Sequence, residues 1–195
     1  PYSGKCCPGW AGGAGYIGSH VVRQLGEAGY QVIVYDNCST GSPQALLNGT
    51  LVVGDLADIA YLRTVFEKYS FNAVFHFAGS LIVPESVQFP LDYYENNTRN
   101  TLNLLRCCTE FGVDQFIFSS TAAVYGEPAV NPVSERAPTV PINPYGRSKL
   151  ASEWLIRDCG TSSNLRSVIL RYFNVSGADV GGRQGLRNLG ATHLI

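Results

Sequence analysis

Short apolar runs alternate with stretches of helical period along most of the chain. Five runs are apolar and rich in β-branched or aromatic residues: 31–35 (QVIVY), 51–53 (LVV), 73–77 (AVFHF), 115–119 (QFIFS) and 167–173 (SVILRYF). Runs of this length and composition predict buried β-strands. Between them, helical spacing of apolar residues predicts helices over 17–28, 91–111 and 145–159. Gly29 directly follows the first helix, at the position where glycine commonly ends one.

The order of these elements predicts the fold class. Strands and helices alternate as βαβαβαβ, and such alternation is typical of a parallel sheet covered by helices on both faces. We therefore predict an α/β chain with a doubly wound, Rossmann-type sheet.

The start of the chain departs from this pattern. A doubly wound dinucleotide-binding domain begins with a central apolar strand that leads directly into a glycine-rich loop. Here residues 6–11 read CCPGWA. Because proline cannot donate to a sheet ladder, Pro8 and Gly9 predict that this strand forms poorly or not at all. Residues 1–11 are thus expected to be an atypical first strand.

Three glycines follow with the spacing of a dinucleotide-binding loop. Gly12, Gly15 and Gly18 form GxxGxxG before the first predicted helix. In such a loop the first glycine permits the tight turn, the second lets the backbone approach a pyrophosphate, and the third lets the helix pack on the sheet. The free N–H groups at the helix N-terminus would face the phosphates. On this pattern alone, a plain turn before a helix remains an alternative.

Two carboxylates follow predicted strands. Asp36 ends the strand after the first helix, where a carboxylate can accept hydrogen bonds from an adenosine ribose and would repel a 2′-phosphate. This favours NAD over NADP. Asp55 follows the third short strand and is placed to meet the adenine, with a helix N-cap or turn residue as an equal alternative.

A tyrosine, a lysine and a hydroxyl cluster suggest proton-transfer chemistry. Tyr145 and Lys149 are four residues apart, and therefore lie on one face of the predicted helix. A phenol with a pKa of about 10 is a poor base at neutral pH, so a nearby ammonium is needed to stabilise the phenolate. Ser119, Ser120 and Thr121 place hydroxyls at the carboxyl end of a strand, where open α/β sheets place their chemistry.

The motifs GGAGYIGSH, YDN, HFAG, PESV, YYENN, FSSTAAVYGE, NPYGRSK and LRYFNVSGA occur in this order along the chain. From about residue 12 to residue 195, they resemble the UDP-glucose/UDP-galactose 4-epimerases of the extended short-chain dehydrogenase/reductase family. The resemblance implies an enzyme that uses NAD to oxidise and re-reduce carbon 4 of a UDP-sugar, and so interconverts UDP-galactose and UDP-glucose. Related 4,6-dehydratases carry an acidic pair directly after the catalytic threonine. Ala122 and Ala123 stand there in this chain, which favours epimerisation.

The resemblance also assigns roles to individual residues. Thr121, Tyr145 and Lys149 take the catalytic positions, and Thr121, Tyr145 and Asn174 would contact the UDP-sugar. The residues expected to bind the cofactor lie in the glycine loop, at strand ends and in two helices: Gly12, Gly15, Tyr16, Ile17, Gly18, Asp36, Asn37, Asp55, Leu56, Phe77, Ala78, Gly79, Asn97, Tyr145, Lys149 and Tyr172.

The resemblance further divides the chain and suggests an assembly. Residues 1–175 would form the NAD-binding domain. Residues 176–195 would begin a sugar-nucleotide-binding region that is incomplete here, because family members continue beyond this point. The helices predicted over 91–111 and 145–159 could pair across a two-fold axis in a homodimer. Two other functions stay open: a 4-epimerase for another UDP-sugar, such as a uronate or a pentose, and an NAD-binding fragment without catalytic activity.

Composition and charge bear on which partners and which cellular compartment are expected. The chain has 14 Lys+Arg and 15 Asp+Glu, a formal net charge of -1, so no basic footprint points to a nucleic-acid partner. No apolar run approaches the roughly 18 residues of a membrane span, so no membrane partner is expected. The six cysteines form no CxxC motif and hence no zinc site by spacing. In an α/β domain they are expected to be reduced thiols, which favours the cytoplasm.

Overall fold

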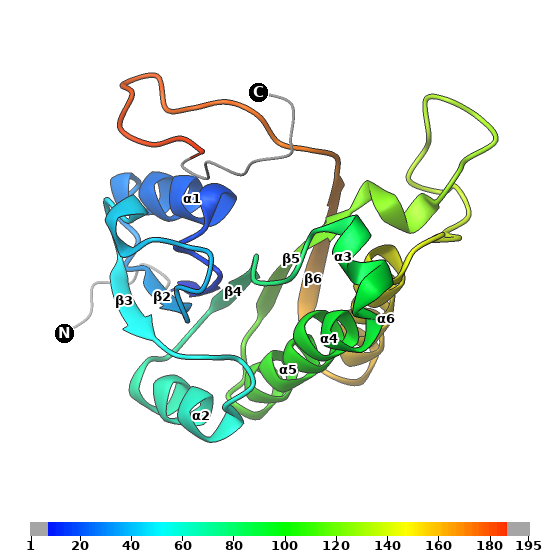
Figure 1. The fold of residues 1–195 in the computed structure, drawn as a ribbon. Coiled ribbons are helices and arrows are strands. Elements are labelled where there is room, and N and C mark those ends of the chain that lie inside the picture. Colours follow the sequence, from blue (N-terminus) through cyan, green and yellow to red (C-terminus); the bar gives the residue numbers. More distant parts are fainter. Residues whose placement is uncertain (1–7, 187–195) are drawn as a thin grey trace.

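The computed structural model describes residues 8–186, and a six-stranded sheet lies at its centre (Figure 1). The strands lie in the order β3-β2-β1-β4-β5-β6, and every neighbouring pair is parallel. Their bounds are Pro8–Ala11 (β1), Ile33–Asp36 (β2), Thr50–Val53 (β3), Ala73–His76 (β4), Gln115–Thr121 (β5) and Arg166–Tyr172 (β6). The strand order reverses beside β1, which is the doubly wound topology. The predicted fold class is therefore confirmed.

Helices connect the strands. Their bounds are Tyr16–Glu27 (α1), Ile59–Lys68 (α2), Val83–Gln88 (α3), Pro90–Tyr93 (α4), Asn100–Glu110 (α5) and Pro144–Ser162 (α6). The first and last predicted helices correspond to α1 and α6, whereas α2 and α3 were not predicted. Gly29 has a φ of 86° just beyond α1, which is the left-handed conformation that ends a helix.

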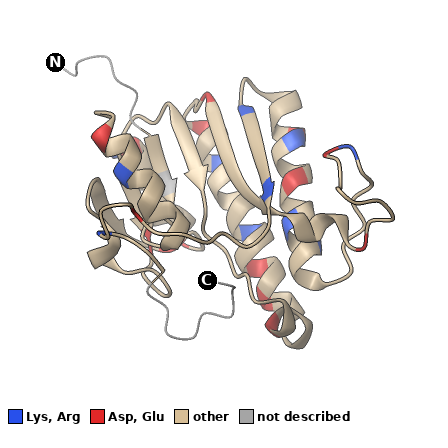
Figure 2. Cartoon of the chain, turned by 90° about the horizontal axis from the view of Figure 1, so that it is seen from above, with Lys and Arg blue, Asp and Glu red and all other residues tan. Residues whose placement is uncertain are grey.

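The helices cover the sheet from both sides (Figure 1). On one face, Val22 of α1 packs with Val32 and Val34, and all three are almost fully buried. On the other face, α2, α5 and α6 bury a larger core, in which Phe116 and Phe118 of β5 are completely buried. Burying each such side chain contributes roughly 1.5–3 kcal/mol. Charged residues of both signs are interspersed on the helices (Figure 2).

The prediction that the first strand forms poorly is wrong. Gly9 of β1 pairs in parallel register with Ile33 of β2 and with Val74 of β4. Pro8 is the first residue of the strand, a position where a missing N–H is tolerated. A Cβ on Gly9 would lie 2.9 Å from the Phe71 Cδ1 atom, so the glycine allows this ring to pack directly on the backbone.

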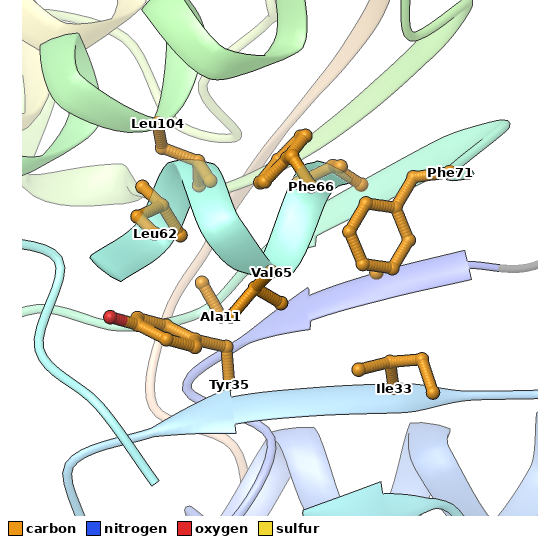
Figure 3. A pocket seen from close by; sticks show the side chains of 10 residues that line it. Ala11, Ile33, Tyr35, Leu62, Val65, Phe66, Phe71 and Leu104 are labelled. Atoms are coloured by element: carbon orange, nitrogen blue, oxygen red, sulfur yellow. The ribbon is translucent and has the colours of Figure 1, made fainter. Parts of the chain in front are cut away.

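The small residues of β1 leave an apolar cavity of about 20 Å³ between the sheet and α2. Figure 3 shows that Ala11, Ile33, Tyr35 and Val65 point into it. Ligand sites usually measure about 300 Å³ or more. This cavity is therefore a packing gap and not a ligand site.

The helix predicted over 91–111 contains a π-helical turn, Tyr94–Arg99, between α4 and α5. The turn shifts the backbone hydrogen-bond pattern at Asn97. The Asn97 carbonyl accepts hydrogen bonds from the side chains of Thr101 and Ser152, the latter at 3.1 Å. The π turn thus joins this helix to α6.

Residues 173–186 follow β6 and run beside α1 (Figure 1). The Arg23 guanidinium forms an ion pair with Asp179 at 3.0 Å, and its Nε donates to Gln184 Oε1 at 2.8 Å. The Gln184 amide also donates to the Ala45 carbonyl at 2.7 Å. The described part of the region that we expected to bind the sugar nucleotide is therefore attached to the glycine-loop helix.

Some expectations fall outside the described residues, namely those for Cys6, Cys7 and positions 187–195. The four cysteines at positions 38, 107, 108 and 159 are free thiols. Within residues 8–186, no helix combines the length and apolarity needed to cross a membrane.

Candidate functional site

The glycine loop joins β1 to α1, and two of its glycines are required by the protein itself. Gly12 has a φ of 81°, and a Cβ there would lie 2.3 Å from the Ala78 backbone nitrogen. A Cβ on Gly18 would lie 2.3 Å from the Gly12 carbonyl oxygen. These contacts explain the turn and the close helix packing predicted for the first and third glycines.

Gly15 is different. A Cβ there would meet nothing closer than the Gly12 oxygen at 3.6 Å, and its φ of −76° suits any residue. Nothing within the described protein therefore demands glycine at this position. Gly15 is also the N-cap of α1, and it provides no side-chain cap for the free N–H groups of Tyr16, Ile17 and Gly18. An uncapped helix N-terminus beside open space is suited to bind an anion.

The residues predicted to bind adenosine meet at the carboxyl ends of β2 and β3. Asp36 is buried, and its two carboxylate oxygens accept from the backbone nitrogens of Ala14 at 2.9 Å and Cys38 at 2.8 Å. The Asn37 amide donates to Asp55 Oδ2 at 2.8 Å. The structure thus brings both carboxylates and Asn37 next to the glycine loop.

Asp55 also has the turn role that the sequence left open. Its Oδ1 accepts from the backbone nitrogen of Ala57 at 2.8 Å, while Asp58 provides the N-cap of α2. Leu56 between them is buried, and its carbonyl accepts from Asn103 at 3.0 Å.

The segment after β4 closes against the glycine loop and then reaches α6. The backbone nitrogens of Phe77 and Ala78 both donate to the Ala11 carbonyl, at 2.8 and 3.1 Å. A Cβ on Gly79 would lie 2.8 Å from Asn97 Oδ1 and 3.0 Å from Lys149 Nζ. Glycine is therefore needed here to let these two polar groups approach the backbone.

Lys149 is almost completely buried on α6. Its Nζ donates to the Ser119 carbonyl at 3.1 Å and lies 5.1 Å from the centre of the Phe118 ring. Burial lowers the pKa of this amine from 10.5 to about 8. The amine therefore still carries a proton for most molecules at neutral pH, but it can lose one more easily than an exposed lysine.

Tyr145 lies one helical turn before Lys149, and Thr121 ends the adjacent strand β5. Burial raises the pKa of the Tyr145 phenol, whereas a hydrogen bond with the Thr121 side chain acts in the opposite direction. Asn143 caps α6 by accepting from the Gly146 nitrogen at 2.8 Å, and Pro144 occupies the first turn. This cap fixes where the helix starts and hence where Tyr145 points.

Tyr172 joins the same group of side chains from β6. Its hydroxyl forms a hydrogen bond with that of Ser119, and burial raises the pKa of its phenol. Asn174 is exposed in the segment after β6. The predicted catalytic residues and Tyr172 are therefore brought together at the carboxyl ends of β5 and β6.

Asn97 is buried beside these residues in the π turn. Its amide donates to the Ser80 carbonyl at 3.1 Å and to Ser148 Oγ at 3.0 Å, and its Oδ1 accepts from the Ser80 nitrogen at 2.8 Å. These contacts hold the segment after Gly79 against α6. In this structure Asn97 organises the walls of the site.

Sequence reasoning missed Tyr93. This buried side chain packs edge-on against Tyr145, with ring centres 6.4 Å apart and an interplanar angle of 86°. Its hydroxyl accepts from the Ile82 nitrogen at 2.9 Å and lies 2.7 Å from Glu85 Oε2. Tyr93 and Asn97 are four residues apart in the YYENN motif, and this spacing could have indicated that both face the site.

Residues 11–191 match the model of the NAD dependent epimerase/dehydratase family. The chain belongs to this family. It is 55% identical over 185 residues to the UDP-glucose 4-epimerase of Azospirillum brasilense, an alignment that covers 94% of this chain and 53% of that protein. It is 45% identical over 184 residues to UDP-arabinose 4-epimerase 1 of Arabidopsis thaliana, with coverage of 89% and 44%.

Solved structures agree with this family membership. The UDP-glucose 4-epimerase of Brucella ovis in complex with NAD superimposes with a TM-score of 0.94 at 46% identity, and covers 97% of this chain and 58% of that one. The Bifidobacterium longum UDP-glucose 4-epimerase in complex with NAD+ and UDP gives a TM-score of 0.88 at 39% identity, with coverage of 92% and 56%. The resemblance seen in the sequence motifs is confirmed. The chain spans about half the length of the relatives it matches.

Proposed function

We propose that this chain is the NAD-binding part of an epimerase that interconverts UDP-galactose and UDP-glucose. The observation that carries the proposal is the convergence of Thr121, Tyr145 and Lys149 beside Gly79, whose backbone both Asn97 and Lys149 approach closely. The names of the relatives support the reaction. We also propose that residues 1–175 belong to the NAD-binding domain and that residues 176–195 begin the sugar-nucleotide site.

The open space at Gly15 and the uncapped N-terminus of α1 fit a dinucleotide pyrophosphate. In the proposed site, Tyr16 and Ile17 hold that group, while Asp36, Asn37, Asp55 and Leu56 hold the adenosine. The residues Phe77, Ala78, Gly79, Asn97, Lys149 and Tyr172 line the nicotinamide end. When bound, oxidised NAD would supply a positively charged ring that accepts and returns the hydride of sugar carbon 4.

The protein's own residues would move the proton. Tyr145, as phenolate, takes the proton of the sugar 4-hydroxyl at its phenol oxygen and later returns it. Thr121 hydrogen-bonds to that phenol, and Asn174 contacts the sugar nucleotide. The Lys149 ammonium favours the phenolate electrostatically, because an opposite charge nearby lowers the pKa of a phenol.

The test is proton NMR of UDP-galactose incubated with the purified chain and NAD. We expect UDP-glucose to form, and the Tyr145→Phe variant should retain NAD but lose turnover. A parent chain that binds NAD without converting UDP-galactose would favour one of the alternatives. UDP-arabinose is then the next substrate to test, because an Arabidopsis thaliana relative of that name is 45% identical. If neither sugar is converted, a UDP-uronate is tested next, and conversion of none of the three would favour a cofactor-binding fragment without activity.

We further propose that the protein is a cytoplasmic homodimer. Apolar side chains are exposed on α3, α4 and α6, including Val87, Leu91 and Trp154, which are 62, 79 and 56% exposed. Pairing of these helices with a second copy would bury them. Light scattering should give twice the mass of one chain for the parent and a monomer for Leu91→Lys. The free thiols of the described chain are consistent with a reducing compartment.

A further inference from the structure

A buried ion pair lies beneath the carboxyl ends of β5 and β6. Glu153 of α6 is completely buried, and Arg171 of β6 donates from Nε to its Oε1 at 2.9 Å and from Nη2 to its Oε2. The Ser120 hydroxyl of β5 also donates to Glu153 Oε1, at 2.5 Å. Two strands and one helix therefore meet at a single carboxylate.

Tyr125 extends this ion pair into the loop after β5. Its phenol oxygen accepts from Arg171 Nη1 at 2.9 Å, and the guanidinium lies 4.9 Å from the centre of its ring. Tyr125 belongs to the short 3₁₀ helix Ala122–Tyr125, which directly follows Thr121. We call Ser120, Tyr125, Glu153 and Arg171 the anchor network.

Two members of the anchor network directly precede residues of the candidate site. Ser120 precedes Thr121, and Arg171 precedes Tyr172. In the sheet register Ser120 pairs with Arg171, and Thr121 pairs with Tyr172. Because side chains alternate along a strand, Ser120 and Arg171 share one face of the sheet, where both contact Glu153 of α6.

On the helix side, the spacing connects Glu153 to the two α6 residues of the site. Glu153 lies four residues after Lys149, which in turn lies four residues after Tyr145. Residues four apart lie on one face of a helix, so the three side chains form one row along α6. A shift or rotation of α6 relative to β5 would move Glu153 and Tyr145 together.

Stability alone does not explain a charged pair at this place. Removing both charges from water is costly, and apolar side chains of similar volume often serve as well or better in a protein interior. A bidentate carboxylate–guanidinium pair instead has strict geometry, because its planar groups must meet at defined distances and angles. Such a pair is suited to hold two elements in one position.

We propose that Glu153 and Arg171 are positioning residues, which hold α6 against β5 so that the Tyr145 phenol stays within hydrogen-bond distance of Thr121. This inference extends the proposed function, and rests on it for the role of the phenol. Loss of the pair would loosen the contact between Thr121 and Tyr145. Because hydrogen bonding from Thr121 lowers the pKa of Tyr145, a looser contact should raise that pKa.

The test compares matched variants of the full chain in the presence of NAD. The double variant Glu153→Leu with Arg171→Met removes both charges without leaving either one unpaired. Glu153→Gln keeps the shape and one acceptor oxygen, and provides a second reading if the double variant does not fold. Arg157→Ala is the control, since Arg157 contacts the same carboxylate at 3.3 Å from an exposed position far from the described site residues along α6.

The measurement is the titration of Tyr145 in chains labelled with 3-fluorotyrosine, whose phenol is more acidic than that of tyrosine. Fluorine NMR follows each ring, and Tyr145→Phe assigns the signal. We expect the midpoint of Tyr145 to rise by about one pH unit in the double variant, by less in Glu153→Gln and not at all in Arg157→Ala. NAD affinity should change less than about threefold, because no member of the network belongs to the proposed cofactor contacts.

An unchanged Tyr145 midpoint in a folded double variant, or in Glu153→Gln if the double variant is unfolded, overturns the proposal. Turnover of UDP-galactose is measured in parallel, and its acid limb should move upward with the midpoint. The two readouts separate the two hypotheses. A parent chain without turnover in which the midpoint still shifts refutes the epimerase function but retains the positioning role.

Discussion

Alanine substitutions at Gly15 and Gly18 separate the glycine that a ligand requires from the glycine that the fold requires. At Gly18 an added Cβ would lie 2.3 Å from the Gly12 carbonyl oxygen, far inside van der Waals contact. Either α1 or the loop must move. Overpacking of this kind costs on the order of 1–3 kcal/mol of unfolding free energy.

At Gly15 the same change should be nearly neutral for folding. The Cβ would have no neighbour closer than 3.6 Å, and the backbone already has a φ that alanine adopts. Alanine is a weaker N-cap than glycine. It also lowers the conformational entropy of the unfolded chain, which stabilises the folded state by about 0.4–1 kcal/mol. The two effects oppose each other, so the free energy of unfolding should change by less than about 1 kcal/mol.

Gly15→Ala, which should leave the free energy of unfolding nearly unchanged, should in contrast weaken the binding of NAD. If the pyrophosphate lies against the α-carbon of Gly15, a methyl group there occupies its place, and the dissociation constant should rise at least about tenfold, or about 1.4 kcal/mol. Urea unfolding gives the stability of each variant, and calorimetric titration with NAD gives the affinity.

Two results would refute this reasoning. A Gly15→Ala chain that binds NAD as tightly as the parent places the pyrophosphate elsewhere. A Gly18→Ala chain as stable as the parent shows that the contact between α1 and the loop is not tight. Gly12→Ala is a further control, because its φ of 81° adds about 1–2 kcal/mol of backbone strain to the steric conflict.

Three other predictions concern burial and packing. Replacing Lys149 with Met should raise the free energy of unfolding at pH 7 by on the order of 2 kcal/mol, because burial lowers the pKa of the amine to about 8 and the folded chain bears the cost of the charge. Between about pH 8 and 10.5 the unfolded lysine binds more protons than the folded one, so the stability of the parent rises with pH. The difference in unfolding free energy between variant and parent should therefore shrink. An equal difference in urea titrations at pH 7 and pH 10 would contradict this. Ala11→Val should raise the free energy of unfolding by about 1 kcal/mol, because it fills the cavity beside β1. Gly9→Ala should lower it, because the added methyl group conflicts with the Phe71 ring. Thermal unfolding measures both, and midpoints that shift in the same direction would contradict the prediction. Arg23→Ala removes the ion pair with Asp179 and the hydrogen bond to Gln184, two of the contacts that attach residues 173–186 to α1. Trypsin should therefore cleave after Arg183 faster than in the parent, and equal rates would argue that Arg23 contributes little to this attachment.

The sequence contained most of the information about the sheet edge that carries the site. Asp36, Asp55, Gly79 and Thr121 each follow an apolar run, and parallel strands bring such positions to one edge. Their convergence could therefore be predicted without any knowledge of side-chain packing. The fold class followed from the same alternation of strands and helices.

Three features could not be predicted in this way. The rule against proline in central strands made β1 look improbable, but Pro8 stands at its first position, where the rule does not apply. The π turn in Tyr94–Arg99 changes hydrogen bonds without any distinctive composition. The pairing of Glu153 with Arg171 depends on how α6 lies across β6, which no local pattern specifies.

The π turn also makes the length of this helix significant over evolutionary time. A π turn holds one residue more than an α turn, so deleting one residue from Tyr94–Arg99 would give an uninterrupted α-helix with better backbone hydrogen bonds. The turn holds its extra residue within one rotation, so the same deletion would leave α4 and α5 near their present orientation while restoring regular α-helical hydrogen bonds at Asn97. The Asn97 carbonyl would then be less free to accept from the Thr101 and Ser152 side chains, which join this helix to α6. Substitutions in this segment can thus be tolerated one at a time, while a deletion that improves the helix itself would be eliminated by selection.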